Sequence, residues 1–183
     1  MLSRARLLHN IGMNTSPQPS ASSDDLVQQS PAHRAVLNRL QALLPAESVI
    51  TDAAGLRPYE TDGLTAIREM PWVVVLPETE AQVADIVRCC AEYGVPIIPR
   101  GAGTGLSGGA RPHQEGVVLG LSKMSAILDI DPQNRIAKVQ PGVRNLAITQ
   151  AAQAHGLYYA PDPSSQIACS IGGNVAENAG GVH

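Results

Sequence analysis

The chain has 183 residues, of which 44% are hydrophobic and 16% charged, and its formal net charge is −3 at pH 7. This length is enough for one hydrophobic core, with room for a small subdomain. The mild acidity, the single Trp and the absence of Phe argue against a nucleic-acid partner, which would need a basic surface or aromatic stacking positions.

The sequence also argues against a membrane span and a metal centre. No apolar run reaches the roughly 18 residues of a transmembrane helix. Cys89 and Cys90 are adjacent and Cys169 is distant, so no C-x-x-C pair is present, and the five histidines show no metal-ligand spacing. We therefore expect a cytoplasmic protein with reduced cysteines and no bound metal.

The first 29 residues differ from the rest. They are rich in Ser, Asn, Gln and Pro and show no hydrophobic periodicity, so we expect a disordered leader over residues 1–29. Arg4 and Arg6 faintly resemble the start of a transit peptide, whereas Met13 offers a later start of translation, and both interpretations stay open. We assign residues 30–183 to one incomplete globular domain.

Helical and strand patterns alternate from Ser30 onwards. Ser30 and Pro31 are typical of a helix start, and residues 79–82 form a capping box for a second helix that ends at Gly94. Asn145 is expected to cap a third helix. We expect helices over 30–44, 79–94 and 145–154, and strands over 48–50, 72–76, 95–98, 117–121, 127–130 and 136–140. The predicted fold class is α+β, with a small βαβ subdomain followed by a mixed sheet with flanking helices.

The most informative segment is the glycine-rich stretch 99–110, which has five glycines, one Arg and two hydroxyl side chains. A glycine-rich loop after a strand can point several backbone N–H groups at one phosphate. Residues 103–108 match G-x-G-x-x-G, but Gly109 and Pro112 exclude the helix that the dinucleotide motif requires. A Walker loop is excluded because Gly109 and Ala110 stand where Lys and Ser/Thr are needed. A phosphate loop between two strands and a plain surface turn remain.

A second stretch, 159–181, mixes glycines with Ser and Asn. These short side chains offer the donors and acceptors that a heterocycle with imide and pyrophosphate groups requires. Two such stretches in one chain favour a bound phosphorylated cofactor over two unrelated turns.

The segments 100–110, 161–165 and 171–181 resemble the FAD-binding domain of the vanillyl-alcohol-oxidase-type flavoproteins, also called the PCMH-type FAD domain. Within that family the chain is most similar to the FAD-linked D subunits of bacterial glycolate oxidases, over residues 37–183. The resemblance implies FAD as the cofactor. The residues expected to contact it are Arg100, Gly101, Ala102, Gly103, Thr104, Gly105, Leu106, Ser107, Pro161, Asp162, Ser164, Ser165, Gly172, Gly173, Asn174, Ala176, Asn178 and Gly180.

These residues have different expected roles. The N–H groups of residues 101–105 are expected to cradle the pyrophosphate, with hydroxyl donors from Thr104 and Ser107. Arg100 either neutralises the phosphates or is a surface charge at the strand end. Asp162, in a stiff Pro-Asp-Pro turn, either contacts the flavin edge or caps a backbone segment.

The second stretch is expected to hold the flavin side of the cofactor. Ser164 and Ser165 would bond the ribityl chain or the phosphates, and residues 172–178 would follow the isoalloxazine ring. Helix capping is the alternative role for Asn174 and Asn178.

The mode of flavin attachment is expected to be non-covalent. Some members of the family carry a His after the paired glycines and bond the flavin through it, but Ala110 stands there in this chain. Cys169 is expected to pack rather than to react.

The resemblance implies FAD-dependent oxidation of a small 2-hydroxy acid, glycolate or D-lactate, to the 2-oxo acid, with electrons passing to an iron–sulfur partner subunit. Such a complex would make the protein peripheral to the inner membrane. The sequence stops directly after a cofactor loop, so we expect an N-terminal fragment whose catalytic residues lie beyond residue 183 and which has no turnover alone. Three alternatives stay open: another flavoprotein oxidase of the superfamily, a binding module without turnover, and a ligand-free α+β domain.

Overall fold

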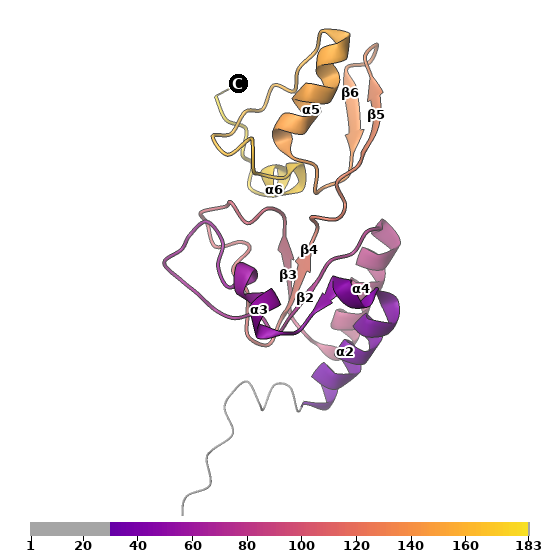
Figure 1. Cartoon of the computed structure of the whole chain (residues 1–183), viewed down its shortest axis with the longest axis vertical. Helices are drawn as coiled ribbons and strands as arrows, with labels where there is room; N and C mark the ends of the chain where they lie inside the picture. The colour runs from indigo at the N-terminus through magenta and orange to yellow at the C-terminus, as the bar shows by residue number, and fades with distance from the viewer. Residues whose placement is uncertain (1–29, 183) are drawn as a thin grey trace, which may run out of the picture.

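The structure is a computed structural model that describes residues 30–182. The leader predicted over residues 1–29 lies outside the described residues. The described chain forms two parts that follow each other along the long axis of Figure 1. The first part ends near residue 121 and holds a four-stranded sheet, and the second holds a two-stranded antiparallel sheet.

The sheet of the first part consists of β1 (Val49–Ile50), β2 (Val73–Val75), β4 (Val117–Gly120) and β3 (Ile97–Arg100), in that spatial order. β1 runs antiparallel to β2, whereas β2, β4 and β3 run parallel to one another. β3 extends two residues beyond its predicted end, and Arg100 pairs with Gly120 at the edge where the parallel strands end. The chain therefore leaves the sheet directly into the glycine-rich stretch.

Two helices cover one face of this sheet, α2 (Pro31–Leu43) and α4 (Glu80–Tyr93). The capping box predicted for α4 is present, because the hydroxyl of Thr79 accepts from the N–H of Gln82 and the Gln82 side chain accepts from the N–H of Thr79. Gly94 ends α4 with a φ of 67°, a left-handed conformation that glycine adopts without strain.

The hydrophobic core follows the alternation of side chains along β2 and β4. Val73 and Val117 face α2 and α4, where Leu40 and Ile86 are also fully buried. Val74 and Val118 face the opposite side, where they pack against Leu56 at the end of the short helix α3 (Ala53–Leu56). Strands buried on both faces give the continuous valine run seen in the sequence.

The second part contains the hairpin β5 (Ile127–Asp131) and β6 (Ile136–Val139), followed by α5 (Asn145–Ala152) and α6 (Ile171–Ala176). The prediction that Asn145 caps this helix is wrong, because Asn145 is the first residue of α5 and Arg144 precedes it at the cap position. The buried side-chain amide of Asn145 donates to the carbonyl of Pro161 at 3.0 Å. The sequence did not predict α6, because its two glycines give it a low intrinsic helix propensity.

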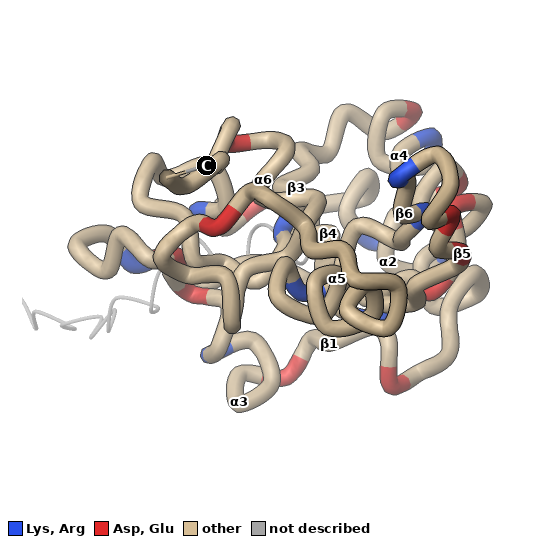
Figure 2. The backbone as a smooth tube through the Cα atoms, turned by 90° about the horizontal axis from the view of Figure 1, so that it is seen from above, with Lys and Arg blue, Asp and Glu red and all other residues tan. Residues whose placement is uncertain are grey.

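The predicted α+β class is confirmed. The mixed sheet is the one in the first part, since β1 runs against its parallel neighbours. Lys and Arg are interspersed with Asp and Glu over both parts of the chain (Figure 2). Within residues 30–182, none of the helices combines the length and apolarity needed to cross a bilayer, and no cluster of three His, Cys, Asp or Glu side chains could hold a metal ion.

Candidate cofactor site

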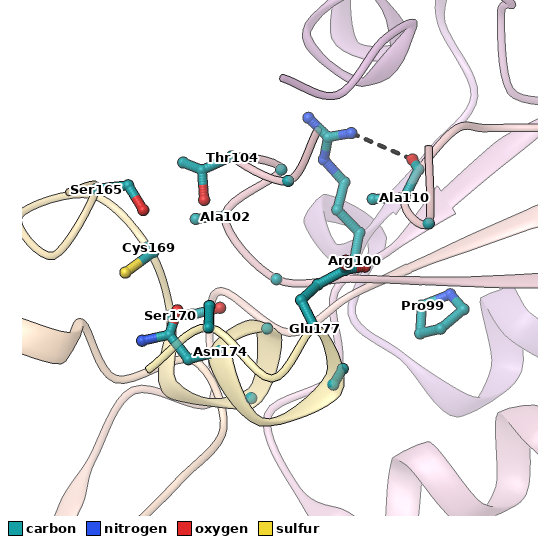
Figure 3. Close-up of a pocket in the computed structure, with 18 of the residues that line it drawn as sticks. Pro99, Arg100, Ala102, Thr104, Ala110, Ser165, Cys169, Ser170, Asn174 and Glu177 are labelled. Carbon is teal, nitrogen blue, oxygen red and sulfur yellow. Dashed lines mark hydrogen bonds between the residues drawn. The ribbon is translucent and has the colours of Figure 1, made fainter. Parts of the chain in front are cut away.

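A cavity of about 770 Å³ brings the two glycine-rich stretches together. Its walls come from the loop that follows β3 and from α6 with the segment before it (Figure 3). The two walls are far apart in the sequence but meet in the fold. Ser107 and Glu177, 70 positions apart, are hydrogen-bonded through their side chains. The sequence-predicted residues that line this cavity are Arg100, Gly101, Ala102, Gly103, Thr104, Gly105, Leu106, Ser107, Ser165, Gly172, Gly173, Asn174 and Ala176.

The loop after β3 exposes backbone donors. Within the described part of the chain, the N–H groups of residues 102–105 donate no hydrogen bond. Gly103 has a φ of 71°, so the chain turns there in a way that side chains with a Cβ rarely allow. A Cβ on Gly101 would overlap the hydroxyl of Ser170, which shows how closely the two walls approach. Free N–H groups in a tight glycine turn are what a phosphate group requires.

Arg100 lies beneath this loop and holds it in place. Its guanidinium donates to the carbonyl of Thr61 at 2.8 Å and to that of Ala110 at 3.4 Å, and it lies 5.5 Å from the centre of the Tyr59 ring. Burial lowers the pKa of Arg100, while the nearby charge of Asp62 favours the protonated form. Both bonds go to protein carbonyls, so Arg100 positions the loop, and at 8% exposure it is not a surface charge. Its predicted role in neutralising the phosphates stays a prediction.

Two buried polar side chains on the other wall lack a partner. Ser170 is 4% exposed and Asn174 is 8% exposed, and neither the Ser170 hydroxyl nor the Asn174 Nδ2 has a hydrogen-bond partner among the described residues. Both residues line the cavity (Figure 3). Buried polar groups without a partner are rare in folded proteins and favour a ligand that supplies the missing bonds.

Some of the predicted contact residues line neither of the two described cavities, namely Pro161, Asp162, Ser164, Asn178 and Gly180. Asp162 instead anchors the end of the chain: its N–H donates to the carbonyl of Gly180, and its carboxylate accepts from the N–H of Val182. The Pro161 carbonyl also has a structural role, since it accepts a hydrogen bond from the side-chain amide of Asn145. A cofactor contact from these residues stays a prediction.

The structure adds residues that the sequence did not indicate. The cavity is also lined by Pro99, Gly109, Ala110, Leu121, Pro141, Cys169, Ser170, Glu177 and Ala179. Ser170 could have been found from the sequence, because it stands directly before the predicted flavin segment. Leu121 and Pro141 follow the ends of β4 and β6, outside both glycine-rich stretches. Cys169 is buried, as expected of a packing residue.

A second cavity has a volume of about 730 Å³. It shares Arg100, Gly101, Ala102 and Ser170 with the first cavity and is extended by Tyr59 and Arg144, among others. The two cavities therefore meet at the glycine loop, which gives an extended ligand room on both sides.

The donor set fits a flavin dinucleotide. The free N–H groups of residues 102–105 suit a pyrophosphate, and the unpaired groups of Ser170 and Asn174 suit the polar edge of a heterocycle or a sugar chain. Gly101 and Gly172 allow the segments around the cavity to pack closely, because a Cβ at either position would clash with a neighbouring residue. A Cβ on Gly172 would lie 2.8 Å from the Cβ of Pro141.

Comparison with known proteins points to the same ligand. A family model described as an FAD binding domain matches residues 71–183. The chain is 57% identical over 148 residues to the glycolate oxidase subunit GlcD of Escherichia coli K12, covering 81% of this chain and 30% of that protein. It is 43% identical over 129 residues to GlcD of Bacillus subtilis, covering 70% and 27%. It is 44% identical over 112 residues to a D-lactate dehydrogenase of Anaerostipes hadrus, covering 61% and 23%.

Solved structures show the same fold. The chain superposes on an alkyldihydroxyacetonephosphate synthase with a TM-score of 0.72 at 22% identity, covering 80% of this chain and 32% of that one. It superposes on a p-cresol methylhydroxylase with bound substrate with a TM-score of 0.61 at 29% identity, covering 71% and 27%. The chain thus spans less than a third of the length of each curated relative described above.

Proposed function

The chain belongs to the FAD-binding domain family, and on that premise we propose that it forms the FAD-binding part of an oxidoreductase that converts a small 2-hydroxy acid, glycolate or D-lactate, to the 2-oxo acid. One observation carries the proposal. The free N–H groups of residues 102–105 and the unpaired buried side chains of Ser170 and Asn174 face one cavity. These groups match the pyrophosphate and the polar ring system of FAD.

When bound, FAD supplies the acceptor for the hydride equivalent that leaves the α-carbon of the hydroxy acid. The chain's own residues bind and orient it. The loop after β3 presents its N–H groups to the pyrophosphate. Arg100 stabilises the conformation of that loop through its hydrogen bonds to the carbonyls of Thr61 and Ala110. Ser170 and Asn174 offer a hydroxyl and an amide to the part of the cofactor that lies along α6. Non-covalent attachment is proposed because Ala110 takes the place of the linking His.

The names of the relatives support the substrate class. The two bacterial GlcD proteins are glycolate oxidase subunits and the third relative is a D-lactate dehydrogenase, and both substrates are small 2-hydroxy acids. We further propose that the protein works in a glycolate oxidase complex with an iron–sulfur subunit that takes the electrons. The free cysteines Cys89, Cys90 and Cys169 fit a reducing compartment, so we place the protein in the cytoplasm, peripheral to the inner membrane through its complex.

A second candidate is a cofactor-binding module without turnover of its own. Within residues 30–182, no His lines either cavity, and the ionisable side chains of the first cavity are those of Arg100, Cys169 and Glu177. Arg100 is hydrogen-bonded to loop carbonyls, and the Glu177 carboxylate accepts a hydrogen bond from Ser107, so no described ionisable side chain of the first cavity is without a protein partner except the Cys169 thiol. Another flavoprotein oxidase of the same superfamily is the third possibility.

The test is direct. The purified chain is reconstituted with FAD, and its visible absorption is recorded after gel filtration. A retained flavin spectrum is expected, and a colourless folded chain at saturating FAD would contradict the cofactor assignment. Dye reduction with glycolate, D-lactate and an aryl alcohol, measured on the protein extended to the length of its curated relatives, then separates the candidates. Bleaching with a hydroxy acid supports the first, and bleaching with the aryl alcohol alone supports another oxidase. Flavin binding without bleaching supports the module.

A further inference from the structure

The carboxylate of Glu177 contacts the glycine-rich loop after β3, which is the loop proposed to bind the pyrophosphate. Glu177 is the residue directly after α6, and its N–H donates to the carbonyl of Gly173 at 3.0 Å. The hydroxyl of Ser107 donates to its Oε2. A Cβ built on Gly109 would lie 2.7 Å from the other carboxylate oxygen, Oε1. Both oxygens therefore face the glycine-rich loop.

The carboxylate of this exposed residue has no cationic partner within residues 30–182. Among the described residues, Glu177 takes part in none of the ion pairs. Arg100 lines the same cavity, but its hydrogen bonds go to the carbonyls of Thr61 and Ala110. The Ser107 hydroxyl is thus the protein group that hydrogen-bonds this charge among the described residues, beside a loop whose N–H groups suit an anion.

A pyrophosphate held by the N–H groups of residues 102–105 would occupy the cavity that Glu177 also lines. Two like charges at van der Waals distance repel each other, and the repulsion is stronger near a protein surface than in bulk water. The Ser107 hydroxyl has one proton to donate, so it can bond the carboxylate or a phosphate oxygen but not both. A phosphate that accepts the Ser107 hydroxyl proton must therefore displace the Glu177 carboxylate.

We propose that Glu177 and Ser107 form a latch that holds α6 against the phosphate loop in the cofactor-free chain, and that FAD binds by displacing the Glu177 carboxylate. The inference rests on the proposed FAD binding and adds a residue that limits the affinity. A side chain that stabilises the cofactor-free protein but repels the cofactor has opposite effects on folding and on binding. Removing it weakens the cofactor-free fold slightly and strengthens cofactor binding.

Two variants separate charge from contact. Glu177→Gln keeps the size and the acceptor oxygen but removes the charge, and we expect it to bind FAD about tenfold more tightly, which corresponds to about 1.4 kcal/mol. Glu177→Ala removes the latch altogether, and we expect tighter FAD binding together with a lower melting temperature of the cofactor-free chain. Glu47→Gln is the matched control, since this exposed residue on another element lines neither cavity.

The experiment titrates the full 183-residue chain and the three variants with FAD and with ADP by isothermal titration calorimetry, alongside melting of the cofactor-free proteins. ADP carries the pyrophosphate without the flavin, so the gain from Glu177→Gln is expected with both ligands. Glu47→Gln is expected to match the wild type in every measurement.

Three results would overturn the latch while leaving the proposed function intact. The first is unchanged FAD affinity in Glu177→Gln, and the second is weaker affinity, which would mean that the carboxylate accepts a bond from the cofactor. The third is a gain with FAD but none with ADP, which would place the effect away from the pyrophosphate. If neither ligand binds the wild type or any variant, the proposed FAD binding fails together with the latch.

Discussion

The guanidinium of Arg100 lies directly under Gly103. A Cβ on Gly103 would come within 2.5 Å of the guanidinium carbon, and the φ of 71° at this position already disfavours any residue other than glycine. The last residue of β3 and the turn three residues later therefore form one unit, in which the glycine-rich loop wraps over the buried arginine. The shape of the phosphate loop depends on both residues.

We predict that Gly103→Ala weakens FAD binding at least tenfold. The added methyl group strains the left-handed backbone by about 1–2 kcal/mol and forces the guanidinium of Arg100 to move. Gly105→Ala is the matched variant in the same loop, because its Cβ would meet nothing closer than the Glu177 side chain at 4.0 Å. Fluorescence titration with FAD gives both affinities, and equal losses in the two variants would contradict the role of the Arg100–Gly103 contact.

We predict that Arg100→Met lowers the free energy of unfolding by about 1–3 kcal/mol, because the partly buried carbonyl of Thr61 loses a charged donor. Stacking on Tyr59 is lost as well. Arg88→Met is the control: Arg88 is exposed and pairs only with Asp85 on the same helix, so we expect a change below about 0.5 kcal/mol. Urea unfolding of the cofactor-free chain measures both, and a loss in Arg88→Met as large as that in Arg100→Met would refute the assignment.

Ser170→Ala is expected to weaken FAD binding about 3- to 10-fold, the value of one ordinary hydrogen bond. The same change is expected to leave the cofactor-free chain as stable as the wild type, since the Ser170 hydroxyl has no partner there. Thr51→Ala is the control, because Thr51 is exposed and lines neither cavity. The measurement is calorimetric titration combined with thermal melting. A drop in melting temperature without a change in affinity would make Ser170 a structural residue.

Stability is expected to fall in alkaline solution. Burial raises the pKa of the Cys90 thiol from 9.0 to about 12. Above pH 9 the thiol ionises in the unfolded chain but stays protonated in the folded one, so the unfolded state is favoured by up to about 1.4 kcal/mol per pH unit until pH 12. Burial raises the pKa of Cys89 in the same direction.

Cys90→Ala tests this pH dependence. Comparing each protein with its own stability at pH 7, where the thiol is protonated in both states, removes the packing cost of the substitution. We expect a shallower decline above pH 9 in the variant by urea unfolding. Identical slopes for variant and wild type would show that Cys90 does not titrate differently in the two states.

The reconstituted flavin is expected to dissociate completely on denaturation. Ala110 lines the cavity where a linking His would stand, and no His lines either cavity within residues 30–182. Mass spectrometry of the denatured protein should therefore give the mass of the chain alone. A retained flavin mass would contradict non-covalent binding and would direct attention to Cys169, whose thiol belongs to a cavity-lining residue.

Local chemistry was readable from the sequence because it depends on neighbouring residues. The capping box at Thr79, the left-handed stop at Gly94 and the break of any helix after Gly109 all follow from side-chain and backbone preferences within a few positions. The same holds for the glycine loop after β3. These features sufficed to predict the α+β class and to exclude both a dinucleotide fingerprint and a Walker loop.

Only the tertiary structure decided which residues meet. The order β1-β2-β4-β3 places the loop after β3 opposite a helix that its own glycines make unpredictable from propensity. That packing turns Arg100 inward, leaves Ser170 without a partner and brings Glu177 onto Ser107 across 70 positions of chain. No local pattern encodes such contacts, because they arise from the burial of both sheet faces and from the close approach that glycine permits between two distant segments.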